Sequence, residues 1–104
     1  MVIAIEEKDN GKVIRVKKGE RLIISLPENA STGYTWLEEV GPVRNMLSLE
    51  KEEYDGNHSV IGAPSVRNWT FIAIKAGQGN IKFHYQRPWL EEAIKSFEVT
   101  VDIV

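Results

Sequence analysis

The sequence lacks cysteine altogether, and this absence excludes disulfide bonds, thiolate catalysis and zinc sites built from thiolates. It also lacks any apolar run near the ~18 residues that a membrane-spanning helix needs. No block of basic residues stands out and the net charge is −2, so we expect neither nucleic acid nor a membrane as partner. The first residues do not resemble a signal peptide, which predicts a cytoplasmic protein, or an exported one if a leader precedes this sequence.

What the sequence does contain is a repeat of two residues. Its 104 residues, 42% of them hydrophobic, suit one domain over residues 1–104, which we expect to be a monomer. Along several segments apolar side chains alternate with polar ones, as in a strand with one buried and one solvated face. The three clearest stripes are Leu22, Ile24 and Leu26; Ile81, Phe83 and Tyr85; and Phe97, Val99, Val101 and Ile103.

Further strands are expected between turn signals. They are Val2–Glu6, Lys12–Lys17, Tyr34–Glu39, Leu47–Glu53 and Trp69–Lys75. Asn10-Gly11 is typical of a hairpin turn, and Glu91–Ala93 could begin a short helix. Seven or eight short strands in this length predict an all-β fold, an immunoglobulin-like antiparallel β-sandwich without a disulfide and with Trp36 in its core. A small closed barrel is the alternative.

The order of the strands predicts which loops share an end of the sandwich. Because successive antiparallel strands run up and then down, loops two connections apart lie together. This places Pro27–Gly33, Tyr54–Val66 and Arg87–Ala93 at one end, and short turns at the other. Elaborate loops on a rigid scaffold are where binding residues usually lie, so we expect a binding protein with this end as its contact surface.

The third of these loops carries the sharpest signal. Pro88 cannot continue a central strand, so Trp89 falls at or beyond the strand end. Tryptophan and arginine dominate the energetics of protein interfaces, which makes Trp89 a candidate anchor. The alternative is that Trp89 folds back and covers the end of the core, as large apolar side chains commonly do.

Three motifs on these loops resemble the chagasin-type inhibitors of cysteine peptidases. That family carries N-P-T-T-G-[YF], G-x-G-G and R-P-[WF] in this order on an immunoglobulin-like sandwich. The first motif matches residues 29–34 with two substitutions, one of them Ala30 in place of proline. The second matches only the front of residues 62–65, whereas the third matches residues 87–89 in full.

The resemblance implies a reversible, non-covalent inhibitor of papain-like cysteine peptidases that blocks the active-site cleft with three loops. The first loop would cover the catalytic cysteine, and the other two would grip the sides of the cleft. The implied peptidase-binding residues are Asn29, Ala30, Ser31, Thr32, Gly33, Tyr34, Gly62, Ala63, Pro64, Ser65, Val66, Arg87, Pro88 and Trp89. The resemblance implies no catalytic residue, no metal and no cofactor.

Other functions on the same fold stay open. Trp89 and Tyr54 could stack on a sugar in a carbohydrate-binding module, and a protein-binding accessory module would use a sheet face instead. A hydrolase is disfavoured, because Asp55, His58 and Ser59 are triad residue types crowded into one loop. The other histidine, His84, falls on the polar face of its strand, where we expect it to be solvated.

Overall fold

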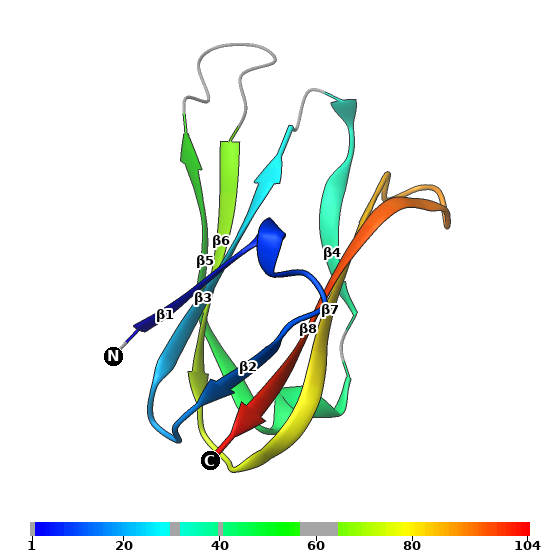
Figure 1. Ribbon diagram of the computed structural model, residues 1–104. Coiled ribbons are helices and arrows are strands. Elements are labelled where there is room, and N and C mark those ends of the chain that lie inside the picture. The colour runs from blue at the N-terminus through cyan, green and yellow to red at the C-terminus, as the bar shows by residue number, and fades with distance from the viewer. Residues whose placement is uncertain (1, 30–31, 40, 57–64) are drawn as a thin grey trace.

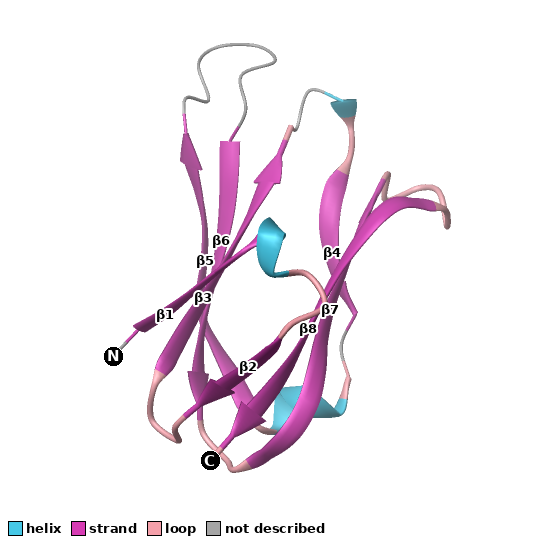
Figure 2. Cartoon of the chain, viewed as in Figure 1, coloured by secondary structure: helices cyan, strands magenta, loops and turns pink. Residues whose placement is uncertain are grey.

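The computed structural model describes residues 2–29, 32–39, 41–56 and 65–104, and these form eight strands in two four-stranded sheets (Figures 1 and 2). One sheet has the strand order β1-β3-β6-β5 and the other β2-β8-β7-β4. The strands are β1 (Val2–Glu6), β2 (Val13–Val16), β3 (Arg21–Glu28), β4 (Thr35–Glu39), β5 (Leu47–Gly56), β6 (Ser65–Ala73), β7 (Gly77–Gln86) and β8 (Ala93–Ile103). The 3-10 turns η1 (Glu7–Asp9) and η3 (Pro42–Asn45) lie between strands. The predicted sandwich is thereby confirmed.

The core follows the two-residue stripes. The apolar members of all three predicted stripes are buried between the sheets, and Trp36 joins them with 1% of its surface exposed. Aromatic rings fill the middle, since Trp69 packs on Phe83 with ring centroids 4.4 Å apart. The alternation is sufficient to choose the inward face because successive side chains of a strand point to opposite sides.

The N-terminal segment differs from the expected hairpin. Strands β1 and β2 belong to different sheets, and each pairs in parallel, β1 with β3 and β2 with β8. Asn10 and Gly11 bind the backbone of β8 instead, through Gly11 N–H to the Glu98 carbonyl (2.7 Å) and Glu98 N–H to Asn10 Oδ1 (2.9 Å). The chain crosses between sheets here, which lets Ile5 and Val16 bury their side chains in the same core.

Two loop boundaries also differ from the expectation. The ladder between β5 and β6 continues to Gly56↔Ser65, so Tyr54, Asp55 and Val66 lie in strands and not in a loop. The strand β3 likewise continues through Pro27 to Glu28. Proline is tolerated at this position because β1 ends opposite Ser25, which leaves β3 as an edge strand on that side.

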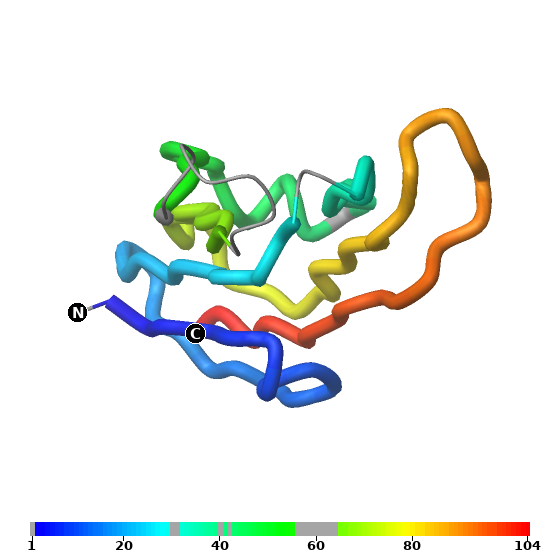
Figure 3. Tube along the Cα trace, turned by 90° about the horizontal axis from the view of Figure 1, so that it is seen from above, coloured from blue at the N-terminus to red at the C-terminus, as the bar shows by residue number. Residues whose placement is uncertain are grey.

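The short helix expected at Glu91–Ala93 is absent, and Ala93 instead begins β8 opposite Gln86. The ladder leaves only residues 87–92 to reverse the chain, and a turn at Arg87–Leu90 already uses most of them. The resulting β7–β8 hairpin extends well beyond the rest of the sandwich (Figure 3). No described helix is long and apolar enough to cross a membrane.

Candidate functional site: the loop end of the sandwich

The strand ends that flank the three predicted loops share one end of the sandwich, as predicted, and we call this end the loop end (Figure 1). The strand registers place Glu28 opposite Ser65, Gly56 opposite Ser65 and Thr35 opposite Gln86. The opposite end carries the short turns, where Gly19 N–H donates to the Ala73 carbonyl at 2.8 Å.

The first loop is held by Thr32. Its hydroxyl donates to the Asn29 carbonyl at 2.8 Å and accepts from Tyr34 N–H at 3.3 Å. The N–H of Asn29 donates to the Tyr85 hydroxyl at 3.2 Å, which fixes the start of the loop to the core. Asn29, Thr32, Gly33 and Tyr34 therefore lie at the loop end, whereas Ala30 and Ser31 lie outside the described residues.

The first and third loops contact each other at Gly33. This glycine has a φ of 82°, and a Cβ built on it would lie 3.1 Å from Trp89 Cη2, so both its backbone and its surroundings favour the absence of a side chain. The guanidinium of Arg87 lies over the Tyr34 ring at 4.7 Å, and its Nε–H donates to the Thr32 carbonyl at 3.4 Å. The two loops thus form one surface.

The third loop presents its tryptophan to solvent. Leu90 N–H donates to the Arg87 carbonyl at 2.9 Å, and the Gln86 side chain donates to the Leu90 carbonyl at 2.8 Å, so Pro88 and Trp89 occupy a closed turn. Trp89 is 70% exposed and does not cover the core, in agreement with the anchor interpretation.

The second loop contributes less than expected among the described residues. Ser65 is buried and its hydroxyl donates to the Glu28 carbonyl at 2.8 Å, so it supports the loop end from below. Val66 is exposed on β6. Gly62, Ala63 and Pro64 lie outside the described residues.

A buried charge, which the sequence analysis missed, lies beneath these loops. Glu28 is the last residue of β3 and only 3% exposed. Its Oε1 accepts hydrogen bonds from Trp36 N–H (2.9 Å), from the Thr35 hydroxyl (2.8 Å) and from Arg67 Nη1 (3.3 Å). The sequence held one indication of this burial. Glu28 lies two residues after Leu26 and so continues the inward-facing stripe of Leu22, Ile24 and Leu26.

Arg67 is the counterion, and it joins the two sheets. From β6 its Nη1 donates to the Thr35 hydroxyl and to the Trp36 carbonyl on β4, each at 3.0 Å. Its Nη2 donates to Glu52 of β5, and its guanidinium lies 4.8 Å from the centre of the Trp69 ring. Four strands therefore meet at one guanidinium directly below the loops.

The environment of Glu28 favours its charged form. Burial alone would raise its pKa, but the hydrogen bonds from Trp36, Tyr54 and Thr35, together with the charge of Arg67, outweigh burial and lower the pKa below its usual value of 4.5. The carboxylate consequently stays ionised in mildly acidic solution.

This lowered pKa predicts how stability depends on pH. A group with a depressed folded pKa contributes stability that is complete above the unfolded value, near 4.5, and that is lost as the pH falls through the folded value. We expect Glu28→Gln to lower the free energy of unfolding by about 1–3 kcal/mol at pH 7, the range for a hydrogen-bonded charge. Urea titrations of both proteins from pH 7 to pH 3 should show this difference shrinking below pH 4.5, and a difference that grows there would contradict the assignment.

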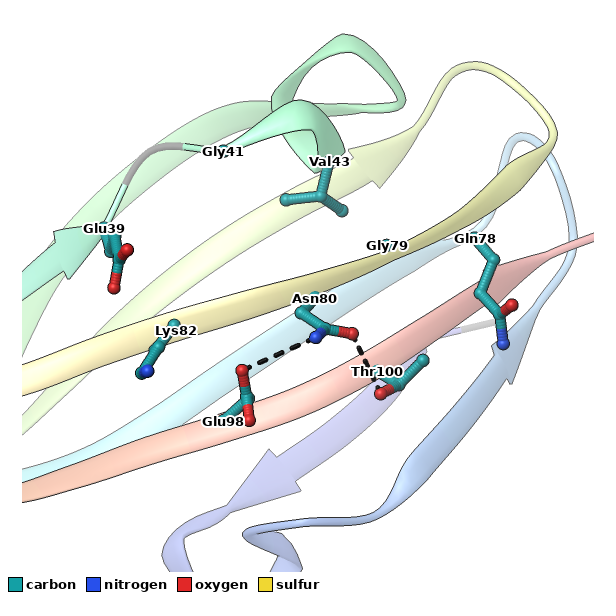
Figure 4. A pocket seen from close by; sticks show the side chains of 9 residues that line it. All are labelled: Glu39, Gly41, Val43, Gln78, Gly79, Asn80, Lys82, Glu98 and Thr100. Atoms are coloured by element: carbon teal, nitrogen blue, oxygen red, sulfur yellow. Dashed lines mark hydrogen bonds between the residues drawn. The ribbon is translucent and has the colours of Figure 1, made fainter.

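A separate hollow lies on the outer face of the second sheet, away from the loop end (Figure 4). It is lined by Glu39, Gly41, Val43, Gln78, Gly79, Asn80, Lys82, Glu98 and Thr100. Asn80 is already hydrogen-bonded to Thr100 at 3.0 Å, and none of the described residues that line the hollow carries an aromatic ring for stacking on a sugar. The hollow therefore gives no support to the carbohydrate alternative.

The described residues also give no support to catalysis or metal binding. His84 keeps 30% of its side chain exposed, and its Nε2 lies 2.7 Å from Glu39 Oε2. Asp55 lies in β5, and His58 and Ser59 lie outside the described residues. No group of three potential metal ligands occurs in the part of the chain that the structure describes.

Comparisons with known proteins agree with the geometry. Residues 15–101 match the family model described as "Chagasin family peptidase inhibitor I42". Among curated proteins, the chain is 28% identical to chagasin of Trypanosoma cruzi over 101 residues, which covers 93% of this chain and 92% of chagasin.

Solved structures of other proteins have a similar fold. The crystal structure of the cysteine protease inhibitor EhICP2 from Entamoeba histolytica superposes with a TM-score of 0.88 at 27% identity, covering 99% of this chain and 96% of that one. PbICP-C, solved in complex with falcipain-2, has a TM-score of 0.67 at 16% identity, covering 98% of this chain and 99% of that one, and shows likeness of fold alone.

Proposed function

Because this chain belongs to the chagasin family of peptidase inhibitors, we propose that it blocks the active-site cleft of a papain-like cysteine peptidase with its loop end. The chain is an inhibitor and not an enzyme. The observation that carries the choice of surface is the contact between Gly33 and Trp89, which joins two of the family's motifs into one exposed face.

The first loop is the part that approaches the catalytic cysteine. Gly33 lets the backbone come close to another chain, and the hydrogen bonds of Thr32 hold the loop in its own shape. A loop held in this way is not drawn into the extended form of a substrate, so the cysteine has no well-placed carbonyl to attack. Inhibition then needs no covalent step and is reversible.

The third loop supplies the adhesive contact beside the cleft. Trp89 offers a large rigid apolar surface, and its turn is closed by hydrogen bonds before binding. An interface of about 800 Å² per partner supports tight binding when the loops lose little freedom on association. The hydrogen bonds of Thr32 in the first loop and of Leu90 in the third loop reduce the freedom that these residues lose on binding.

The test is a titration of active papain with the purified protein, following hydrolysis of a small fluorogenic peptide. We expect stoichiometric inhibition that reverses on dilution, and an inhibitor chain that mass spectrometry finds uncleaved and unmodified. Full peptidase activity at micromolar excess, for papain and for several related enzymes, would refute the proposal. A serine peptidase serves as the specificity control, and we expect the protein not to inhibit it.

A further inference from the structure

We propose that Glu28 and Arg67 are positioning residues: their buried ion pair fixes the bases of the first two loops in the geometry that binds the peptidase. The inference rests on the proposed function and deepens it. Neither residue belongs to the three family motifs, and neither is exposed enough to form a large contact with a partner, since the Arg67 side chain is 16% exposed.

Glu28 connects both ends of the first loop. It directly precedes Asn29, and its carboxylate accepts from Thr35 and Trp36, the residues that follow the loop. Its own carbonyl accepts from Ser65, where β6 begins after the second loop. One residue therefore sets the distance between three strand ends from which these loops leave.

Arg67 extends the connection across the sandwich. It binds Thr35 and Trp36 of β4 in one sheet while belonging to β6 in the other, and it reaches Glu52 of β5. A planar guanidinium with several donors in fixed directions holds these partners at defined angles, which a lysine ammonium does not do. The relative position of the sheets at the loop end is thereby fixed.

Stability alone is a poor reason for this pair. Removing two charges from water is costly, and apolar residues of similar volume are commonly as stabilising as a buried ion pair. The neighbouring inward position on β3 holds Leu26, which pairs with Arg67 in the ladder, so apolar packing is compatible with this region. Among the described residues, the buried Nε–H of Arg67 also has no acceptor. What the charges add is directional geometry.

The first loop needs such support from outside. Residues 29–34 contain no proline, so their covalent structure does not restrict the backbone. The hydrogen bonds of Thr32 act within the loop, and they depend on the distance between its ends. Loss of the ion pair would therefore increase the freedom that the loop loses on binding, and weaken inhibition without removing any contact.

The experiment compares Glu28→Gln and Arg67→Lys with a matched control. The control is the double variant Arg21→Gln, Glu50→Gln, which removes another ion pair between β3 and β5, with Arg21 Nε 2.5 Å from Glu50, at the end away from the loops. We measure the inhibition constant for papain, the free energy of unfolding, and amide hydrogen exchange of Asn29, Thr32 and Tyr34 in the free protein.

We expect each single variant to raise the inhibition constant at least about tenfold and to speed exchange at these three amides. The control variant should leave the inhibition constant and the exchange rates of these amides unchanged, whatever its effect on the free energy of unfolding. Combining Glu28→Gln with Arg67→Lys should weaken inhibition by much less than the product of the single effects, because the two residues act as a unit.

Unchanged inhibition in both variants, with stability reduced, would overturn the positioning role and leave a structural pair. If the unaltered protein inhibits no peptidase, the proposed function fails by itself. Amide exchange then still decides the positioning role, because equal exchange rates in the unaltered protein and both variants would overturn it.

Discussion

Replacing Trp89 by alanine is expected to raise the inhibition constant for papain roughly 30- to 1,000-fold, corresponding to about 2–4 kcal/mol. The side chain is 70% exposed, and its turn is closed before any partner arrives. Truncation would therefore remove a large rigid apolar surface at a place where little freedom is lost on binding. Fluorogenic assays at several peptidase concentrations measure the change.

Stability separates this role from a structural one. Since Trp89 contributes little to the core, the free energy of unfolding should change by no more than about 0.5 kcal/mol. The matched control is Ile74→Ala, which removes an exposed apolar side chain at the opposite end and should leave inhibition unchanged. If Trp89→Ala inhibits as well as the unaltered protein, the third loop is not the anchor.

Much of this site was predictable because strands obey a simple rule. Alternation in segments such as Phe97–Ile103 identifies the inward face without knowledge of the neighbouring strands. The up-and-down order of strands then places the loops, and it brought Gly33 and Trp89 to the same end although they lie far apart in sequence. These inferences needed only local pattern and chain direction.

Pairing partners were beyond that rule. Asn10-Gly11 has the composition of a hairpin turn, but β1 pairs with β3 in one sheet and β2 pairs with β8 in the other. A turn sequence reports the conformations open to two residues, whereas the choice of sheet depends on which edges the rest of the fold leaves free. For the same reason the sequence placed Tyr54 and Val66 in a loop, whereas the structure has them in the ladder between β5 and β6.

The buried ion pair escaped prediction for a different reason. Charged residues are almost never fully buried unless paired, so Glu28 and Arg67 read as solvated or loop residues when taken one at a time. Only the register Leu26↔Arg67 and Glu28↔Ser65 brings both charges to the inward face at adjacent positions. Two residues that lie 39 positions apart in the sequence have no local signature as a pair.

Trp36→Ala should give the largest loss of stability, about 3–5 kcal/mol, which is a large part of the 5–15 kcal/mol typical of a small domain. The indole is buried, packs on Tyr85 with centroids 4.8 Å apart, and donates from Nε1 to the Pro27 carbonyl at 2.8 Å. Truncation would leave a cavity and an unpaired carbonyl directly below the first loop. Urea unfolding followed by circular dichroism measures the loss.

The adjacent residue provides the control, because Leu37 lies on the opposite face of the same strand and is 37% exposed. We expect Leu37→Ala to cost about 1 kcal/mol or less, since its side chain already contacts water. Nearly equal losses at the two positions would mean that the faces of β4 are not divided between core and solvent. The first loop would then have no fixed support on that strand, and the arrangement of Gly33 against Trp89 would need another cause.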